Sequence, residues 1–128
     1  LLTFAGKGYS PAFAARFSVI ARRIHKGATI QIVTGPDDIC APVLNNPQSH
    51  CRNVSVGLRD DQAARDVGAL LGRVIRPGDS FPLDGQTIAK MRAGFAQTRI
   101  RAACLGCEWS DLCSTIAYGD YAGTVIPA

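Results

Sequence analysis

The stretch SPAFAARFSVIARRIHKG, residues 10–27, has the clearest helix signal in the chain. Ser10 followed by Pro11 is typical of a helix start, because the hydroxyl can cap the first turn and proline suits the first helical position. Gly27 suits the left-handed residue just past a helix end. Between them, four large apolar residues recur at helical spacing: Phe13, Phe17, Ile20 and Ile24. The stretch therefore predicts an amphipathic helix with one face in a core.

Weaker signals on the C-terminal side of this helix predict the remaining elements. Residues 28–34 alternate in the manner of a short strand. Further helical segments are expected at residues 60–71, after the capping residue Asp84, and from about Thr98 through Cys107, with a last turn from Ser110. We therefore expect residues 1–128 to form a small single domain of the mainly α (α+β) class. It would have about four helices, one or two short strands and a cysteine-stapled C-terminal segment.

Composition limits the classes of protein to which the chain can belong. With 128 residues, of which 47% are hydrophobic, it is long and apolar enough for one packed core. No apolar run reaches the ~18 residues that a membrane helix needs, so we expect no membrane partner. The net charge of +4 is small, which leaves nucleic-acid binding as a minor alternative that only composition supports. Because the chain begins with Leu1 rather than Met, we expect the native N-terminus to precede it.

Five cysteines give the chain its main chemical signal: Cys40, Cys51, Cys104, Cys107 and Cys113. An odd number argues against a complete disulfide framework. A domain of this size also needs no disulfides for its stability. We therefore expect a reducing, cytoplasmic location, where clustered thiols indicate metal or redox chemistry.

The run CLGCEWSDLC, residues 104–113, has the spacing C-x2-C-x5-C. Two cysteines three residues apart lie on one face of a helix or tight turn, so the sulfurs of Cys104 and Cys107 can both ligate one metal centre. The five intervening residues give Cys113 enough chain to return to the same point. We expect these three thiolates to bind a metal centre, with Trp109 shielding it from water and Arg101 offsetting its negative charge.

Other interpretations of this run are weaker. A redox dithiol at Cys104 and Cys107 lacks the flanking residues and the βαβ context of such motifs. Single structural cysteines act as small hydrophobes, but three within ten residues indicate more than packing. Zinc favours two C-x2-C pairs or a histidine pair, whereas this chain has one such pair and only His25 and His50. An iron–sulfur cluster is therefore preferred, with zinc as the alternative.

The fourth ligand must come from elsewhere, and Cys51 is preferred to Cys40. Both bracket an irregular loop, but Cys40 directly follows a strand-and-turn unit, whereas Cys51 has more freedom to reach the C-terminal run. His50 and Arg52 beside Cys51 can donate hydrogen bonds to sulfur or stabilise a thiolate. Two alternatives stay open. The loop cysteines act together at a separate redox or metal site, or they pair as a disulfide.

The cysteine run with a remote upstream cysteine resembles the [4Fe–4S] staple of helicase-nuclease and CRISPR-associated exonucleases. The resemblance covers about ten residues and implies the cluster type. It does not imply nuclease activity, because no carboxylate–lysine motif surrounds the run in this chain.

Three motifs in order resemble a bacterial and archaeal family, domain of unknown function family 1284: GKGYSP at residues 6–11, GPDDIC at residues 35–40, and the C-terminal run with its tryptophan. Members of that family are suspected iron–sulfur proteins, so the resemblance implies a cluster here. Relatives also have a His-His-Leu-Leu-Cys segment before the point where this sequence begins, which implies a further ligand. Many have Cys-x-x-Cys-Pro after the Asp-Asp-Ile motif, where this chain has Val43 at the second cysteine position.

These observations predict a small iron–sulfur protein, [4Fe–4S] by resemblance, that transfers electrons or senses redox state with an unidentified redox or protein partner. One alternative is a zinc- or cluster-stapled module that binds a protein or nucleic acid. Another is a cluster-dependent enzyme that uses Asp37 and Asp38. Turn formation explains these aspartates better, and no nucleophile, base and orienting group can be assembled from the sequence. No catalytic residue is therefore assigned.

Overall fold

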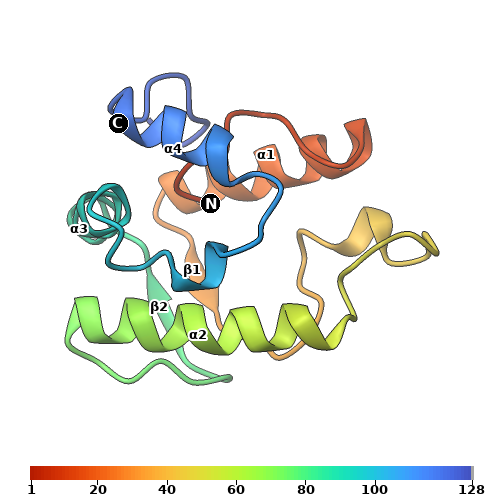
Figure 1. Cartoon of the computed structure of the whole chain (residues 1–128), viewed down its shortest axis with the longest axis horizontal. Helices are drawn as coiled ribbons and strands as arrows, with labels where there is room; N and C mark the ends of the chain where they lie inside the picture. Colours follow the sequence, from red (N-terminus) through yellow and green to blue (C-terminus); the bar gives the residue numbers. More distant parts are fainter. Residues whose placement is uncertain (128) are drawn as a thin grey trace.

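The computed structural model describes residues 1–127. In these residues helices predominate, as the sequence predicts, and the elements follow one another as α1 (Pro11–His25), β1 (Thr29–Gln31), the 3-10 helix η1 (Ala41–Val43), α2 (Val54–Leu71), β2 (Ser80–Pro82), α3 (Gly85–Ala96), the 3-10 helix η2 (Ala102–Cys104) and α4 (Ser110–Tyr118). α1 and α4 lie on the side of the molecule opposite α2, and α3 lies at one end (Figure 1). None of the described helices is both long and apolar enough to cross a bilayer.

The two strands form a minimal antiparallel sheet. Ile30 of β1 is opposite Phe81 of β2, and Thr29 and Gln31 are opposite Pro82 and Ser80. The predicted strand at residues 28–34 is therefore shorter than its alternating pattern indicates. It ends after Gln31 because its partner β2 is only three residues long.

The first helix forms as its local signals predict. The Ser10 hydroxyl accepts a hydrogen bond from the Phe13 backbone N–H at 3.1 Å, and Pro11 occupies the first helical position. Gly27 lies just past the end with a φ of 89°, in the left-handed region. Ile24 is buried, while Phe17 and Ile20 pack against the core from its edge. The predicted stripe is therefore the face that α1 turns inward.

The second helix is longer than the sequence indicates. We expected it to begin at Asp60, but α2 begins at Val54. It ends at Leu71, as expected, and is followed by the expected Gly72, whose φ is 71°. Its first turns expose Val54 and Leu58, which are 82% and 65% accessible. Because these apolar residues face solvent, the start of α2 has no inward stripe that periodicity can detect.

The predicted helix from Thr98 through Cys107 is wrong. Thr98 has a φ of 63°, and the Arg99 backbone N–H bonds back to the Gly94 carbonyl, which is how a helix terminates rather than begins. The segment continues through the short η2 and then a loop. The expected last turn from Ser110 is instead the nine-residue helix α4.

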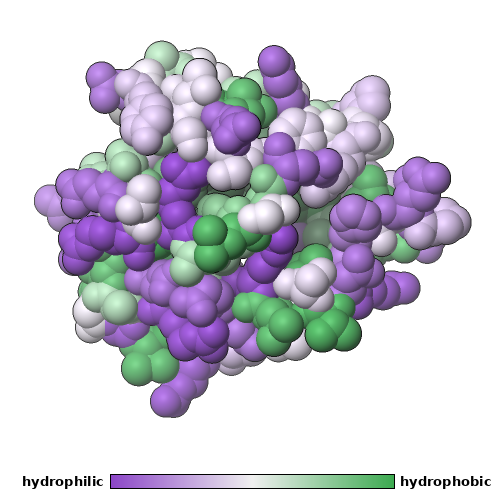
Figure 2. All heavy atoms as spheres, in the orientation of Figure 1, coloured by the Kyte–Doolittle hydropathy of each residue, from purple (hydrophilic) through white to green (hydrophobic). Residues whose placement is uncertain are grey.

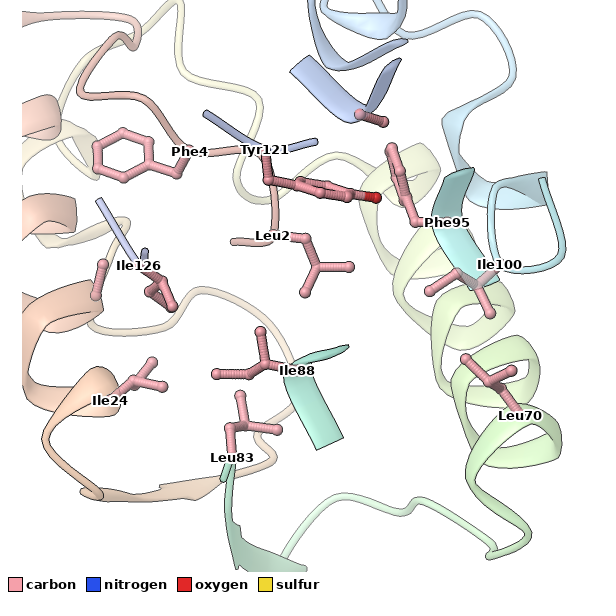
Figure 3. Close-up of a cluster of buried hydrophobic side chains, with 12 residues drawn as sticks. Leu2, Phe4, Ile24, Leu70, Leu83, Ile88, Phe95, Ile100, Tyr121 and Ile126 are labelled. Carbon is pink, nitrogen blue, oxygen red and sulfur yellow. The ribbon is translucent and has the colours of Figure 1, made fainter. Parts of the chain in front are cut away.

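The core joins residues from both ends of the chain to the helices (Figure 3). Its buried apolar members are Leu2, Phe4, Ala21, Ile24, Leu70, Leu83, Ile88, Phe95, Ile100, Ala117, Tyr121 and Ile126. The C-terminal tail has no periodicity, yet it contributes Tyr121 and Ile126, which are 7% and 3% accessible. The tail is therefore part of the core.

Buried Arg92 of α3 holds the two ends of the chain together. Its guanidinium donates to the carbonyls of Ile126 and Pro127, each at 2.7 Å, and to the Leu2 carbonyl at 3.3 Å. It also lies over the Tyr121 ring, whose hydroxyl donates to the Arg92 carbonyl at 2.7 Å. This arrangement fixes the N-terminal segment against the C-terminal half, where three of the cysteines lie.

Candidate metal centre

The three C-terminal cysteines lie on successive short elements of the chain. Cys104 ends η2, Cys107 lies in the following loop, and Cys113 is in the first half of α4. The Cys107 N–H bonds to the Cys104 carbonyl at 3.1 Å, and the Cys113 N–H bonds to the Trp109 carbonyl at 2.9 Å. Gly106 makes the loop possible, because its φ of 72° is costly for any residue with a Cβ. All three cysteines are half-buried and free.

The three C-terminal thiols lie close enough to influence one another by charge. Burial raises the pKa of Cys104, and negative charge on Cys107 or Cys113 would raise it further. Arg101 acts in the opposite direction, because its guanidinium favours the Cys104 thiolate by charge and by a hydrogen bond. The structure thus brings Arg101 and Cys104 together, as the sequence analysis expects of a charge-balancing residue.

Several contacts hold Arg101 in this position. Its guanidinium donates to the Ser110 carbonyl at 3.2 Å and to the Ser114 hydroxyl at 2.9 Å, both in α4. It also stacks over the Phe95 ring at 4.6 Å from the centroid. These contacts tie the turn that contains Cys104 to the helix that contains Cys113.

The N-terminal segment supplies a contact that sequence analysis did not identify. The Thr3 hydroxyl donates to the Cys113 sulfur at 3.2 Å, across 110 residues of sequence. Nothing near Thr3 in the sequence marks it as a partner of a cysteine. Arg59 of α2 was missed in the same way, and it donates to the Leu105 carbonyl at 3.3 Å beside Gly106.

Trp109 lies beside the cysteine turns and packs on another aromatic residue. Its ring meets the Tyr9 ring edge to face, with the centroids 6.0 Å apart. Tyr9 in turn meets Phe13 of α1 at 5.4 Å. Trp109 is half-buried and lies two residues after Cys107 in the sequence.

The two loop cysteines influence each other electrostatically. Burial raises the pKa of Cys40 to about 12, the backbone contact with Asp37 opposes this rise, and the Cys51 thiol contributes to it. His50 and Arg52, expected next to a bound centre, are both exposed.

Asp37 shapes the start of the loop. Its carboxylate accepts hydrogen bonds from the backbone N–H groups of Ile39 at 2.8 Å and Cys40 at 3.3 Å. The carboxylate therefore acts as a turn former, the role that the sequence analysis prefers for it. Asp38 is exposed, and its carbonyl accepts a hydrogen bond from Arg16 of α1 at 3.1 Å.

The start of the chain lies against the C-terminal cysteine group, since the Thr3 hydroxyl donates to the Cys113 sulfur. The face drawn in Figure 2 is hollowed near its centre, and polar and apolar side chains mix around the hollow.

The five cysteine side chains have the right chemistry to ligate a soft metal centre. Thiolates are the preferred ligands of iron–sulfur clusters and of structural zinc, and all five cysteines are unpaired. Within residues 1–127, no three cysteine, histidine or acidic side chains already converge in an arrangement that would hold a single metal ion.

The profile of one protein family matches residues 8–113, which is most of the chain. Its description is "protein of unknown function (DUF1284)". The chain belongs to this family. This confirms the resemblance drawn from the three sequence motifs, and the matched region ends at Cys113. No curated protein and no solved structure matches the chain significantly.

Proposed function

We propose that this member of the family is a thiolate-ligated iron–sulfur protein, with [4Fe–4S] preferred, that transfers electrons or senses redox state. Cys104, Cys107 and Cys113 would supply three ligands, and Cys51 or Cys40 the fourth. The main support is the C-x2-C-x5-C run with its three free, half-buried thiols, together with the two donors beside them, Arg101 and Thr3. An unidentified redox protein would be the partner.

The two donors suit the ligand chemistry of this chain. A cysteine must lose its proton to ligate a metal, so binding releases protons. Arg101 lowers the cost of that step at Cys104, where burial alone would oppose it. The Thr3 hydroxyl donates to the Cys113 sulfur and would stabilise its negative charge in the same way.

When bound, an iron–sulfur cluster accepts and releases electrons at a potential set partly by hydrogen bonds to sulfur and by solvent exposure. In this chain, Thr3 would provide such a hydrogen bond. Trp109, packed on Tyr9, would limit water access to the turn at Cys107. These residues would therefore tune the centre as well as hold it.

We also infer a cytoplasmic location for the protein. Five free, half-buried thiols would be oxidised in a secretory compartment but persist in a reducing one.

Metal analysis of anaerobically purified protein tests the proposal. We expect brown protein with absorbance near ~400 nm, and iron and acid-labile sulfide in equal amounts. Serine in place of Cys104, Cys107 or Cys113 should each remove most of the iron and sulfide, because a hydroxyl is a poor ligand for a soft metal centre.

Glu108→Gln is the matched control, because Glu108 is an exposed residue within the same run. This variant should retain iron and sulfide at wild-type amounts. Stoichiometric zinc without sulfide would replace the proposal with a zinc-stapled module. Full metal content in all three serine variants would contradict the assignment of the ligands.

A further inference from the structure

The turn that follows α2 holds Arg73 in a defined position. After Gly72, the Arg73 backbone N–H bonds back to the Gly68 carbonyl at 3.0 Å. A Cβ on residue 68 would lie 2.6 Å from the Arg73 carbonyl oxygen, so glycine is what lets the chain turn so closely across α2. The Arg73 guanidinium lies over the Phe81 ring of β2, 4.4 Å from its centroid. Contacts with the backbone and with the side chain therefore both position this cation.

Arg73 and Lys90 make the first of two surface hollows basic. This hollow has a volume of about 340 Å³, and its lining also includes Gln86 and Thr87. Among the described residues that line it, none is acidic. The exposed Asp84 carboxylate nearby caps α3 by accepting from the Thr87 backbone N–H at 2.7 Å. A guanidinium fork, an ammonium, an amide and a hydroxyl together suit a phosphate group, whose oxygens accept several hydrogen bonds.

The second hollow adjoins the first, because Arg73 lines both. It has a volume of about 660 Å³, and Asp61 and Arg65 are the other charged residues that line it. Most of its lining is small or apolar and includes Ala64, Gly68, Ala69, Val74, Ile75 and Pro77. Both volumes lie in the range of small-molecule sites. A basic hollow beside an apolar one fits a ligand with an anionic end and an apolar body.

We propose that the two hollows form one binding site for a small phosphate monoester with a flat, apolar body. The phosphate lies against Arg73 and Lys90, and the flat body lies over the small residues of α2. Among the described residues that line the hollows, none is a cysteine, so the site is separate from the proposed metal ligands. The proposal therefore stands whether or not the C-terminal cysteines bind a cluster.

Calorimetric titration of the full chain, as purified and at physiological ionic strength, tests both halves of the site. The probes are inorganic phosphate, ribose 5-phosphate, phenyl phosphate and adenosine 5′-monophosphate. We expect at least one of the two ring-bearing monoesters to bind roughly 10-fold or more tightly than ribose 5-phosphate, because burial of an apolar ring adds affinity. Preference for adenosine 5′-monophosphate would identify a nucleotide as the ligand, and preference for phenyl phosphate an aryl phosphate.

Substitutions separate the contributions of the two hollows. Arg73→Met should weaken binding of every probe by roughly 10-fold or more, because it removes hydrogen bonds to a charged group, and Lys90→Met should act in the same direction. Ala69→Leu places a larger side chain in the apolar hollow, so it should weaken only the ring-bearing probes. Lys26→Met is the matched control, since it also removes one exposed cation but does not line either hollow.

Amide chemical shifts of the wild-type protein locate the site without relying on any variant, and they also measure probes that bind too weakly for calorimetry. We expect the shifts to cluster in residues 64–77 and 81–90. The proposal is wrong if no probe binds, if the shifts cluster elsewhere, or if ribose 5-phosphate binds as tightly as both ring-bearing probes. Equal weakening by Lys26→Met and Lys90→Met would show unspecific charge attraction and would also overturn it. Iron and sulfide are measured separately, so these outcomes do not bear on the iron–sulfur assignment.

Discussion

The Thr3 hydroxyl donates a hydrogen bond to the sulfur of Cys113 at 3.2 Å, linking the N-terminal segment to the C-terminal cysteine run. A second link is the Val125 backbone N–H, which bonds to the Phe4 carbonyl at 2.9 Å. The N-terminal residues are therefore part of the environment of the proposed ligands. Their effect on a bound centre is open to measurement.

Thr3→Val should weaken metal binding. The variant keeps the shape of the side chain but removes the donor to Cys113, and loss of such an outer contact typically costs about 10-fold or more in metal affinity. The measurement is iron retained per chain during titration with a chelator. Thr3→Ser keeps the hydroxyl and should behave as the wild type. Equal retention in all three proteins would show that this hydrogen bond does not act on the bound centre.

Arg92→Met should destabilise the fold. The guanidinium satisfies the carbonyls of Leu2, Ile126 and Pro127, and its removal would leave buried acceptors without donors. We expect a loss of about 2–4 kcal/mol in the free energy of unfolding, because each unsatisfied buried group is costly. Urea denaturation of the reduced, metal-free protein measures this free energy of unfolding.

Arg92→Lys is the informative comparison for that experiment. Lysine keeps the charge but lacks the planar fork of donors that reaches several carbonyls at once. Its stability should therefore lie between those of the wild type and Arg92→Met. If the methionine variant were as stable as the wild type, the contacts of Arg92 with the chain ends would contribute nothing to the fold.

The stability of the reduced protein should fall as pH rises above about 9. The pKa of Cys40 is about 12 in the folded chain, against 9.0 for an unperturbed thiol. Between these values the unfolded state has lost the Cys40 proton while the folded state keeps it, so higher pH favours unfolding. Burial also raises the pKa values of Cys104 and Tyr121, which act in the same direction.

Cys40→Ser isolates the contribution of that thiol. Between pH 9 and 12, the temperature of half-unfolding should fall less steeply in the variant than in the wild type. Below pH 8, this temperature should change with pH in the same way in both proteins. Thermal unfolding in the presence of a phosphine reductant measures both proteins. Parallel curves across this range would mean that Cys40 titrates equally in the folded and unfolded states.

Local signals were enough to predict much of the fold. The cap at Ser10, the stripe of α1 and the cap at Asp84, whose carboxylate accepts from Thr87 at 2.7 Å, are all encoded within a few residues. The helix predicted from Thr98 failed for a reason that is not local. The chain there must leave α3 through a left-handed residue so that Ile100 can enter the core.

The relationships within the candidate site were harder to predict. The sequence shows the spacing of Cys104, Cys107 and Cys113, because that spacing is local. The contact of Thr3 with Cys113 depends on how the chain ends pack, which no periodicity describes. The influence of Cys51 on the pKa of Cys40 depends on how the segment between them turns, so the sequence left a shared role for the pair as one alternative among several.

The last prediction concerns the fourth ligand of the proposed cluster, for which the sequence favours Cys51 over Cys40. Both thiols are half-buried and free, so exposure alone does not separate them. Cys40 is the more constrained, because its backbone N–H is held by Asp37 and its pKa is raised by burial. Cys51 is flanked by exposed residues, one of which, Arg52, can stabilise a thiolate.

We therefore expect Cys51→Ser to lose most of the iron and sulfide, and Cys40→Ser to keep at least half as much as the wild type. Both proteins are measured after the same anaerobic reconstitution, with Ser49→Ala as a control for changes in the loop itself. If Cys40→Ser loses the cluster while Cys51→Ser retains it, the assignment is reversed. If both retain it, the fourth ligand is neither loop cysteine.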